Sequence, residues 1–258
     1  MKNYYYLIEF QYFGFRYHGW QKQPGLKTVQ GMVEKTLNYI LGHATFKTLS
    51  ASRTDAMVSA GSSAFELFMR EPIDQANLLS ELNVNLPPDI RALKIHEVNK
   101  DFNIIQHAKE KEYLYLFSFG EKKHPFCAPF MTNVAGTLNV ELMAEGAGLF
   151  EGSHDFRQYC YKPRQLTQFV RQVLVSEIKE NTIHTASFFP EQSYVYRVRG
   201  KGFMRHQVRL MMGALFQLGK GSIGLKDIEA SLQGKENNIQ TDIAPSSGLM
   251  LNSVEFGQ

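Results

Sequence analysis

The chain has 258 residues, 43% of them hydrophobic and 21% charged, with a formal net charge of +3. This balance indicates a globular protein of one large or two modest domains, and excludes a disordered chain, a collagen and a coiled coil. No apolar run approaches the ~18–20 residues of a membrane span. Glu9 interrupts the apolar N-terminal stretch, so we expect no secretion signal. The only cysteines, Cys127 and Cys160, suit a reducing cytosol, so we expect a cytoplasmic protein.

The first hundred residues predict the element order β-α-β-β-α-β. Thr28 caps a helix from Val29 to Leu41, which Gly42 closes. Asp74 caps a second helix, which must end before Pro87. Strands are expected at Tyr4–Phe10, Phe46–Ala51, Ala60–Met69 and Arg91–Val98.

The second half is predicted to repeat this order. Asn139 caps a helix that runs through Leu149, and a helix from about Met204 to Leu218 stops at Gly219. The remaining expected elements are strands at Glu112–Phe119, Phe169–Lys179, Ser193–Arg199 and Leu249–Glu255, and a short helix at Leu225–Leu232.

Two such units in tandem indicate an α+β protein made of two ferredoxin-like halves, which we place at residues 1–104 and 105–258. The helices of each half cover one face of its sheet and leave the other face exposed. The antiparallel sheets of the two halves could join edge to edge, and we expect a central basic cleft over them.

Basic residues are concentrated in one part of the chain. Residues 157–220 contain eleven Lys and Arg against three Glu, whereas the segment after residue 220 is net acidic. Such a block is typical of proteins that bind a polyanion, nucleic acid above all. From charge alone, a set of solvated basic faces is the alternative.

Gly219 to Gly224 matches the G-x-G-x-x-G pattern of dinucleotide-binding loops, and Asp242 follows at about the distance of a ribose contact. However, the pattern follows a predicted helix rather than a strand, so we expect a helix end and a turn there. The eight histidines never occur at metal-ligand spacing, so no metal is expected.

A polar loop, Ser52-Arg53-Thr54-Asp55-Ala56, lies between two predicted strands. Arg53 and Asp55 are two residues apart, and both side chains can point into a cleft. Alternatively, the two form an ion pair that only stabilises the loop.

Together with other segments, this loop resembles the TruA family of tRNA pseudouridine synthases. R-T-D-A at residues 53–56 is similar to the signature that carries the family's catalytic aspartate. The other matching segments are G-W-Q-K-Q at 19–23, N-L-P-P-D-I at 85–90, K-E-Y-L-Y at 111–115, E-G-S-H-D-F at 151–156, G-F-M-R-H-Q-V-R at 202–209 and A-P-S-S-G-L-M-L at 244–251. They follow the family's order along nearly the whole chain.

The resemblance implies an isomerase that converts uridine to pseudouridine in tRNA, at positions 38–40 of the anticodon arm, with no cofactor and no metal. The uridine would leave the base stack, where its glycosidic bond is inaccessible. Asp55 would be the essential carboxylate, and Arg53 would fill the vacated space. Tyr113 would stack on the base, or alternatively be a core aromatic residue. Arg209 would pair with Asp55, and Leu249 would form the apolar wall beneath the base.

The resemblance also implies the residues that bind RNA. Trp20 would be a base-stacking platform or, alternatively, a core residue. Gln21 and His206 belong to the matching motifs and are expected to bind substrate. Phosphate contacts are expected from the basic residues beside the motifs, namely Arg16, Lys22, Lys109, Lys111, Arg205 and Lys220. We expect a homodimer, because a single copy offers little surface to bind both the elbow and the anticodon arm of tRNA.

Four positions depart from the family pattern. Met57 and Ser59 stand where bacterial members usually have glycine and histidine. Phe13 stands where the family usually has aspartate, and Ile105 where it usually has arginine. Met57 removes the freedom of glycine to adopt a positive φ beside the loop. The alternatives are therefore a divergent paralogue that modifies another RNA site and a non-catalytic RNA-binding relative or folding helper. A small-molecule α/β enzyme that uses the turn at Gly219 is a further alternative.

Overall fold

The computed structural model describes residues 3–234 and 241–257. Contacts divide the chain into two units, Met1–Lys109 with Met250–Gln258, and Glu110–Leu249. Each unit combines helices with a mostly antiparallel sheet, so the predicted α+β class is confirmed. The division into halves at residues 1–104 and 105–258 stays a prediction. The tandem ferredoxin-like halves, the joined sheet and the basic cleft stay predictions.

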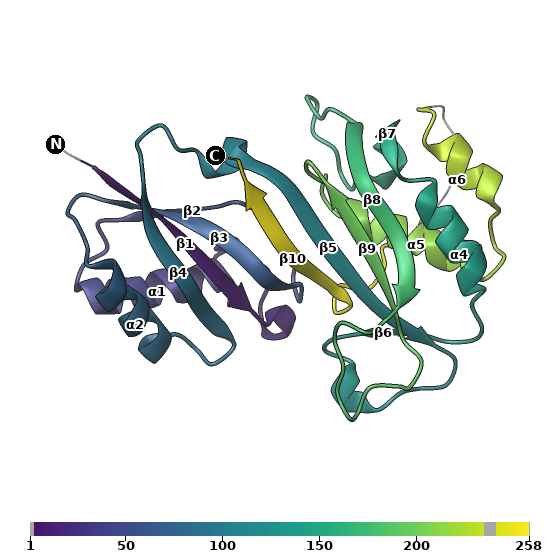
Figure 1. Cartoon of the computed structure of the whole chain (residues 1–258), viewed down its shortest axis with the longest axis horizontal. Helices are drawn as coiled ribbons and strands as arrows, with labels where there is room; N and C mark the ends of the chain where they lie inside the picture. The colour runs from purple at the N-terminus through teal and green to yellow at the C-terminus, as the bar shows by residue number, and fades with distance from the viewer. Residues whose placement is uncertain (1–2, 235–240, 258) are drawn as a thin grey trace. The chain divides into compact units, whose positions relative to one another are not determined.

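The first unit follows the predicted order β-α-β-β-α-β (Figure 1). Its sheet has the strand order β4-β1-β3, and β2 pairs with β3; these pairs are antiparallel. The elements are β1 (Tyr4–Tyr12), the 3-10 turn η1 (Gly14–Arg16), α1 (Val29–Leu41), β2 (Lys47–Ser50), β3 (Ser59–Met69), α2 (Gln75–Asn85), β4 (Ile90–Val98) and the short α3 (Ile104–His107). The last strand, β10 (Leu249–Phe256), pairs in parallel with β3 at Met250 and Leu251.

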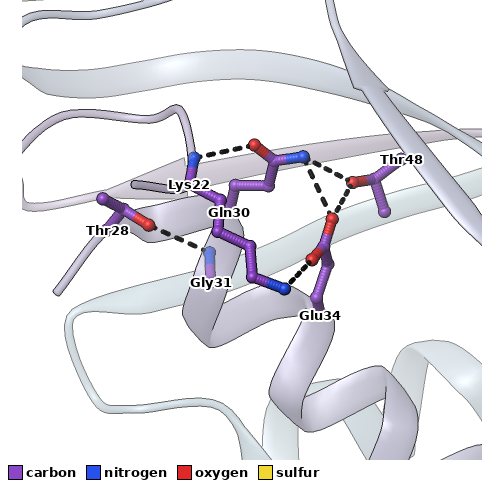
Figure 2. A network of polar contacts seen from close by, with 6 residues as sticks. All are labelled: Lys22, Thr28, Gln30, Gly31, Glu34 and Thr48. Atoms are coloured by element: carbon purple, nitrogen blue, oxygen red, sulfur yellow. Dashed lines mark hydrogen bonds and ion pairs between the residues drawn. The ribbon is translucent and has the colours of Figure 1, made fainter. Parts of the chain in front are cut away.

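The predicted helix caps of the first unit are present. The Thr28 side chain accepts a hydrogen bond from the N–H of Gly31, as Figure 2 shows, and Gly42 ends α1 with a φ of 71°. Asp74 accepts hydrogen bonds from the first N–H groups of α2. These side chains satisfy donors that a helix N-terminus leaves unpaired, which is why the sequence located both starts.

Both faces of β1 contribute to the core of the first unit. Ile8, Phe10 and Tyr12 are buried, whereas Glu9 and Gln11 between them are only partly buried. Alternate residues of a strand point to opposite faces, so one face of β1 is apolar. The other face carries Glu9 and Gln11 and also Leu7, which is buried in a second hydrophobic cluster with Ala64 and Ile104.

The second unit has the strand order β5-β9-β8-β7, with antiparallel pairing, and β6 is parallel to β5. Its strands and α-helices, labelled in Figure 1, are β5 (Ala108–Phe119), β6 (Thr132–Val134), α4 (Val140–Gly148), β7 (Gly152–Asp155), β8 (Val170–Glu180), β9 (Tyr194–Gly200), α5 (Gln207–Gly219) and α6 (Leu225–Ser231). Two 3-10 turns, η2 (Pro125–Cys127) and η3 (Arg157–Tyr159), complete the unit. The short strands β6 and β7 were not predicted, because three or four residues carry no period-2 pattern.

Helix α5 is central to the second unit, because eleven of its 13 residues are buried. It begins at Gln207 rather than at the predicted Met204, since His206 adopts a φ of 58° and the Gln207 side chain accepts a hydrogen bond from the N–H of Met204 (2.8 Å). On the facing strand, the rings of Tyr115 and Phe117 pack edge to face against Phe216. No helix in the described ranges is long and apolar enough to span a bilayer.

Glu66 of β3 is a buried carboxylate, 1% exposed. Its Oε2 atom accepts a hydrogen bond from the N–H of Ile104 at the start of α3 (3.3 Å), and Oε1 has no hydrogen-bond partner among the described residues. Burial raises the pKa of Glu66, although the Ile104 hydrogen bond and the charge of His107 oppose the shift. The carboxyl group is therefore more easily protonated in the folded state than in the unfolded chain.

We predict that Glu66→Gln stabilises the protein at neutral pH. Because the folded-state pKa lies above the unfolded value, the folded state binds more protons, and stability is lost as pH rises through the window between the two values. Glutamine keeps the acceptor and removes the titration. The variant should therefore unfold at a higher temperature at about pH 7 and approach the parent at about pH 4. A difference in unfolding temperature that does not change with pH would contradict this assignment.

Candidate functional site

Backbone hydrogen bonds from another segment hold the loop between β2 and β3. The N–H of Trp20 donates to the carbonyl of Thr54 (3.3 Å), and the N–H of Met57 donates to the carbonyl of Tyr17 (2.9 Å). Within the first unit, Asp55 of this loop is half-buried and Arg53 is exposed to solvent. Both side chains therefore come from a loop whose path other segments fix.

Gly19 allows two backbones to approach closely. It has a φ of +83°, and a Cβ atom there would lie 2.5 Å from the carbonyl oxygen of Thr54. The carbonyls of Gly19 and Trp20 also accept hydrogen bonds from the N–H groups of Val29 and Gln30, the first residues of α1 (3.1 and 2.9 Å). These two N–H groups have no partner within a helix. The Gly19–Trp20 segment therefore caps the start of α1 and also supports the Asp55 loop.

Trp20 lies in the core of the first unit. It is 2% exposed, and its ring packs against Phe10 (5.1 Å between centroids) and Phe65 (5.9 Å). A ring buried on this scale offers no face to a nucleobase. We therefore assign Trp20 a structural role, which is the alternative that the sequence left open, and no longer expect it to stack on RNA.

Met57 adopts the left-handed conformation, with a φ of 67°. The sequence led us to expect that methionine would not take up a positive φ at this position. The backbone does so because the neighbouring hydrogen bonds, from Met57 to Tyr17 and from Val58 to Asp55, fix the turn. This conformation costs a residue with a Cβ atom about 1–2 kcal/mol.

The G-W-Q-K-Q segment is also tied to α1 and β2 by a polar network (Figure 2). Glu34 accepts hydrogen bonds from Lys22 Nζ (2.9 Å) and Thr48 Oγ1 (2.8 Å). The Gln30 side chain accepts a hydrogen bond from the Lys22 N–H (2.9 Å) and donates to Thr48 and Glu34. Gln21 and Lys22 stay exposed, so the predicted phosphate contact Lys22 is held by Glu34 at the surface.

Arg16, another predicted phosphate contact, is bound by Asp89. Its Nε and Nη2 atoms lie 2.8 and 2.6 Å from Asp89 Oδ2, and the Tyr17 hydroxyl donates to Oδ1 (2.7 Å). Partial burial opposes ionisation of Asp89, but the hydrogen bonds from Tyr17 and Arg16 outweigh it and lower the pKa of this carboxyl. Asp89 thus stays ionised and orients the guanidinium.

In the second unit, Lys111 and Tyr113 lie on the same face of β5 as Tyr115. Tyr113 is 9% exposed, and the ring of Phe203 packs edge to face against it (5.4 Å). Burial lowers the pKa of Lys111 to about 8. Lys109, at the start of the same strand, is exposed and belongs to the first unit.

Arg209 of α5 holds the A-P-S-S-G-L segment. Its Nε atom donates to the carbonyl of Ala244 (2.7 Å), and the hydroxyl of Tyr115 donates to the carbonyl of Pro245 (2.8 Å). Leu249 follows in this segment and is 6% exposed. Arg209 is therefore bonded to the segment that leads to Leu249, whereas the arrangement of these residues with Asp55 stays a prediction.

Sequence reasoning missed Tyr161, which carries no motif. Its ring stacks on His206 (4.7 Å between centroids, 16° between planes), and the cations of Lys162 and Arg205 each lie 5.2 Å from its centroid. Two predicted RNA-binding residues, Arg205 and His206, are thus gathered around one aromatic side chain. Lys220, at the C-terminal end of α5, is exposed.

The basic block is partly neutralised by ion pairs, several of them with acids outside residues 157–220. Arg197 contacts Glu112 (2.7 Å) and Glu177 (3.2 Å), and Arg199 lies 3.6 Å from Glu110. Further pairs are Arg157 with Asp155 and Lys179 with Glu177. The charge count over residues 157–220 therefore overstates the basic surface, because strand pairing brings glutamates of β5 beside arginines of β9.

The glycine-rich segment is a helix end and a turn, as predicted. Gly219 is the last residue of α5, and a Cβ atom there would lie 2.5 Å from Met143 Sδ. Gly224 caps α6, where its N–H donates to Asp227 (2.8 Å). These contacts leave no strand-to-helix turn for a pyrophosphate. In the described part of the chain, no cluster of three or more His, Cys, Asp or Glu side chains could hold a metal.

Comparison with known proteins agrees with these motifs. A family model described as tRNA pseudouridine synthase matches residues 147–257. The chain is 32% identical to tRNA pseudouridine synthase A 2 of Bacillus cereus, over 97% of this chain and 99% of that protein. The chain belongs to the TruA family of tRNA pseudouridine synthases. It is also 33% identical to the synthase A of Pseudothermotoga lettingae, over 95% of this chain and 96% of that protein, and 31% identical to that of Shouchella clausii, over 96% and 91%.

For this TruA member, we predict that Met57→Gly stabilises the fold by about 1 kcal/mol, because glycine relieves the left-handed strain and loses part of that gain to backbone entropy. Met57→Ala is the matched control, since alanine shortens the side chain and retains the Cβ atom. Chemical denaturation should give a higher free energy of unfolding for Met57→Gly only. Equal stabilities of the two variants would show that φ is not strained here.

Proposed function

We propose that this protein converts uridine to pseudouridine in tRNA with Asp55 as its essential carboxylate. TruA membership supports both the isomerase class and the tRNA substrate. The observation that carries the proposal is that the chain keeps Asp55, Tyr113 and Arg209 in motifs that match the family, within a similarity that extends along nearly its whole length.

The reaction rearranges one nucleotide without adding or removing atoms. The C1′–N1 bond of the uridine breaks, the uracil rotates, and a C1′–C5 bond forms as C5 loses its proton and N1 gains one. Asp55 promotes the first step, by attack on the sugar or by assisting elimination. Arg209 pairs with this carboxylate, and Tyr113 stacks on the base, with its hydroxyl available to move the C5 proton.

Two further residues act on the extruded nucleotide. Leaving the stack costs a few kcal/mol, so a group that occupies the vacated space favours the extruded state. Arg53 has this role in the proposal, and its exposure on the loop is suited to it. Leu249 provides the apolar wall beneath the base and keeps the detached uracil in place.

We also propose the finer points of recognition. The targets are positions 38–40 of the anticodon arm, and a cytoplasmic homodimer binds that arm and the elbow. Gln21 and His206 bind the substrate, and the phosphate contacts are Arg16, Lys22, Lys109, Lys111, Arg205 and Lys220. Each phosphate contact that is lost should reduce the salt dependence of tRNA binding by about one counterion.

Replacing Asp55 by asparagine tests the proposal most simply. Asp55→Asn should lower tritium release from tRNA labelled at C5 of uridine by about a thousandfold or more, the scale expected for loss of a catalytic group. Binding of tRNA should persist, because the substitution does not alter the backbone hydrogen bonds that hold the loop. The exposed Asp101→Asn is the control and should keep full activity.

The rival functions give different results in the same assay. Equal release by the parent and Asp55→Asn would remove Asp55 from its role. Binding of tRNA without release by the parent protein would indicate a non-catalytic relative. Release from another RNA, and not from tRNA, would indicate a paralogue with a different target.

The lowered pKa of Lys111 predicts a pH dependence of RNA binding. The ammonium group loses its charge as pH rises through about 8, so tRNA affinity of the parent should fall between about pH 7 and about pH 9. Lys111→Arg keeps its charge and should weaken this fall, whereas Lys111→Met should bind weakly throughout. Parallel curves for the three proteins would contradict a phosphate contact by Lys111.

A further inference from the structure

An aromatic pair lies on the turn that follows β1. Phe15 is 36% exposed, and its ring stacks on that of Phe13 with 6.1 Å between centroids and 23° between planes. Phe13 stands where the family pattern has aspartate, so the apolar pair is a departure of this chain. A ring supported from behind by a second ring loses little freedom when a base stacks on it, and such stacking is a main source of affinity for single-stranded RNA.

The neighbouring residue supplies an oriented cation. Asp89 binds two N–H groups of the Arg16 guanidinium, and its side chain is only 10% exposed. The Arg16 side chain is 54% exposed, so the guanidinium remains accessible from solvent. A guanidinium has five N–H donors in a rigid plane, which suits it to a phosphate once its orientation is fixed. The Tyr17 hydroxyl completes the arrangement by holding Asp89 from its other oxygen.

The same turn is bonded to the Asp55 loop and to the start of β3, within the first unit. The N–H of Gly14 donates to the Ser59 hydroxyl (2.9 Å), and the carbonyl of Tyr17 accepts the N–H of Met57 (2.9 Å). The exposed ring and the guanidinium are therefore carried by a segment that also fixes the catalytic loop. RNA that delivers a uridine to Asp55 must pass near such a segment.

We propose that Phe15, backed by Phe13, and Arg16, held by Asp89, bind an unpaired nucleotide that flanks the target uridine. Phe15 stacks on its base and Arg16 contacts its phosphate. Asp89 is a positioning residue that acts through Arg16. This inference rests on the proposed function, because it assumes an RNA substrate. It adds a base-stacking position that neither the motifs nor the charge pattern predicted.

Fluorescence provides a direct test, because the only tryptophan, Trp20, is buried. Phe15→Trp adds an exposed tryptophan at the proposed site, and Tyr39→Trp adds one on the outside of α1, where Tyr39 is 77% exposed. A tRNA transcript should quench the emission of Phe15→Trp far more strongly than that of Tyr39→Trp. Equal quenching in the two proteins would overturn the proposal.

Affinity provides the second test. Phe15→Leu should raise the Kd for tRNA about tenfold, whereas Phe15→Trp should keep it close to the parent value. Leucine preserves apolar packing and thermal unfolding reports the fold, so a loss of binding in a folded Phe15→Leu protein supports stacking. Tyr39→Leu is the control and should bind as the parent does. An unchanged Kd for Phe15→Leu would contradict the proposal.

Salt dependence separates Arg16 from Asp89. Arg16→Gln should lower the slope of log Kd against log salt by about one, while the exposed Arg70→Gln should leave it unchanged. Asp89→Asn keeps the cation but loses its orientation, so it should weaken binding with little change in slope.

The stacking site and the proposed catalysis can fail separately. If Asp55→Asn remained active while Phe15→Leu bound tRNA weakly, the proposed catalytic role would be wrong and the stacking site would be supported. If Asp55→Asn were inactive while Phe15→Leu bound tRNA as the parent does, only the stacking site would be refuted.

Discussion

The candidate site of the first unit depends on the close approach of two backbone segments, one at Gly19 and one at Thr54. A side chain at this position would collide with the carbonyl of Thr54, one residue before Asp55. The same segment satisfies the first N–H groups of α1, so the helix and the loop share one support. Backbone contacts of this kind tolerate changes of side chain. The turn keeps its left-handed residue even though methionine occupies it.

Features set by neighbours in sequence could be predicted well. Thr28, Gly42 and Asp74 located the ends of α1 and α2, because a cap acts within a few residues of itself. The order of strands and helices in the first unit followed from the same local signals. The role of Asp55 could not be predicted in this way. Its loop alone is compatible with a catalytic carboxylate or with a structural ion pair, and only the motifs elsewhere in the chain favour the catalytic role.

Features set by distant contacts could not be predicted. Burial of Trp20 depends on Phe10 of β1 and Phe65 of β3. Pairing of Arg197 with Glu112 depends on the register of β5 and β9, and a charge count along the chain has no access to it. The Arg16–Asp89 contact likewise joins residues that are far apart in sequence.

Pseudouridine mapping in the cell, with and without the gene, is the most direct test of the central claim that the Asp55 loop rearranges a uridine of tRNA. Restoration by the parent gene, and by a gene that encodes Asp55→Asn, should be compared in the same strain. We expect loss of pseudouridine at positions 38–40 of tRNA in the deletion strain, and recovery with the parent gene alone. Recovery with the Asp55→Asn gene, or an unchanged map in the deletion strain, would contradict the account.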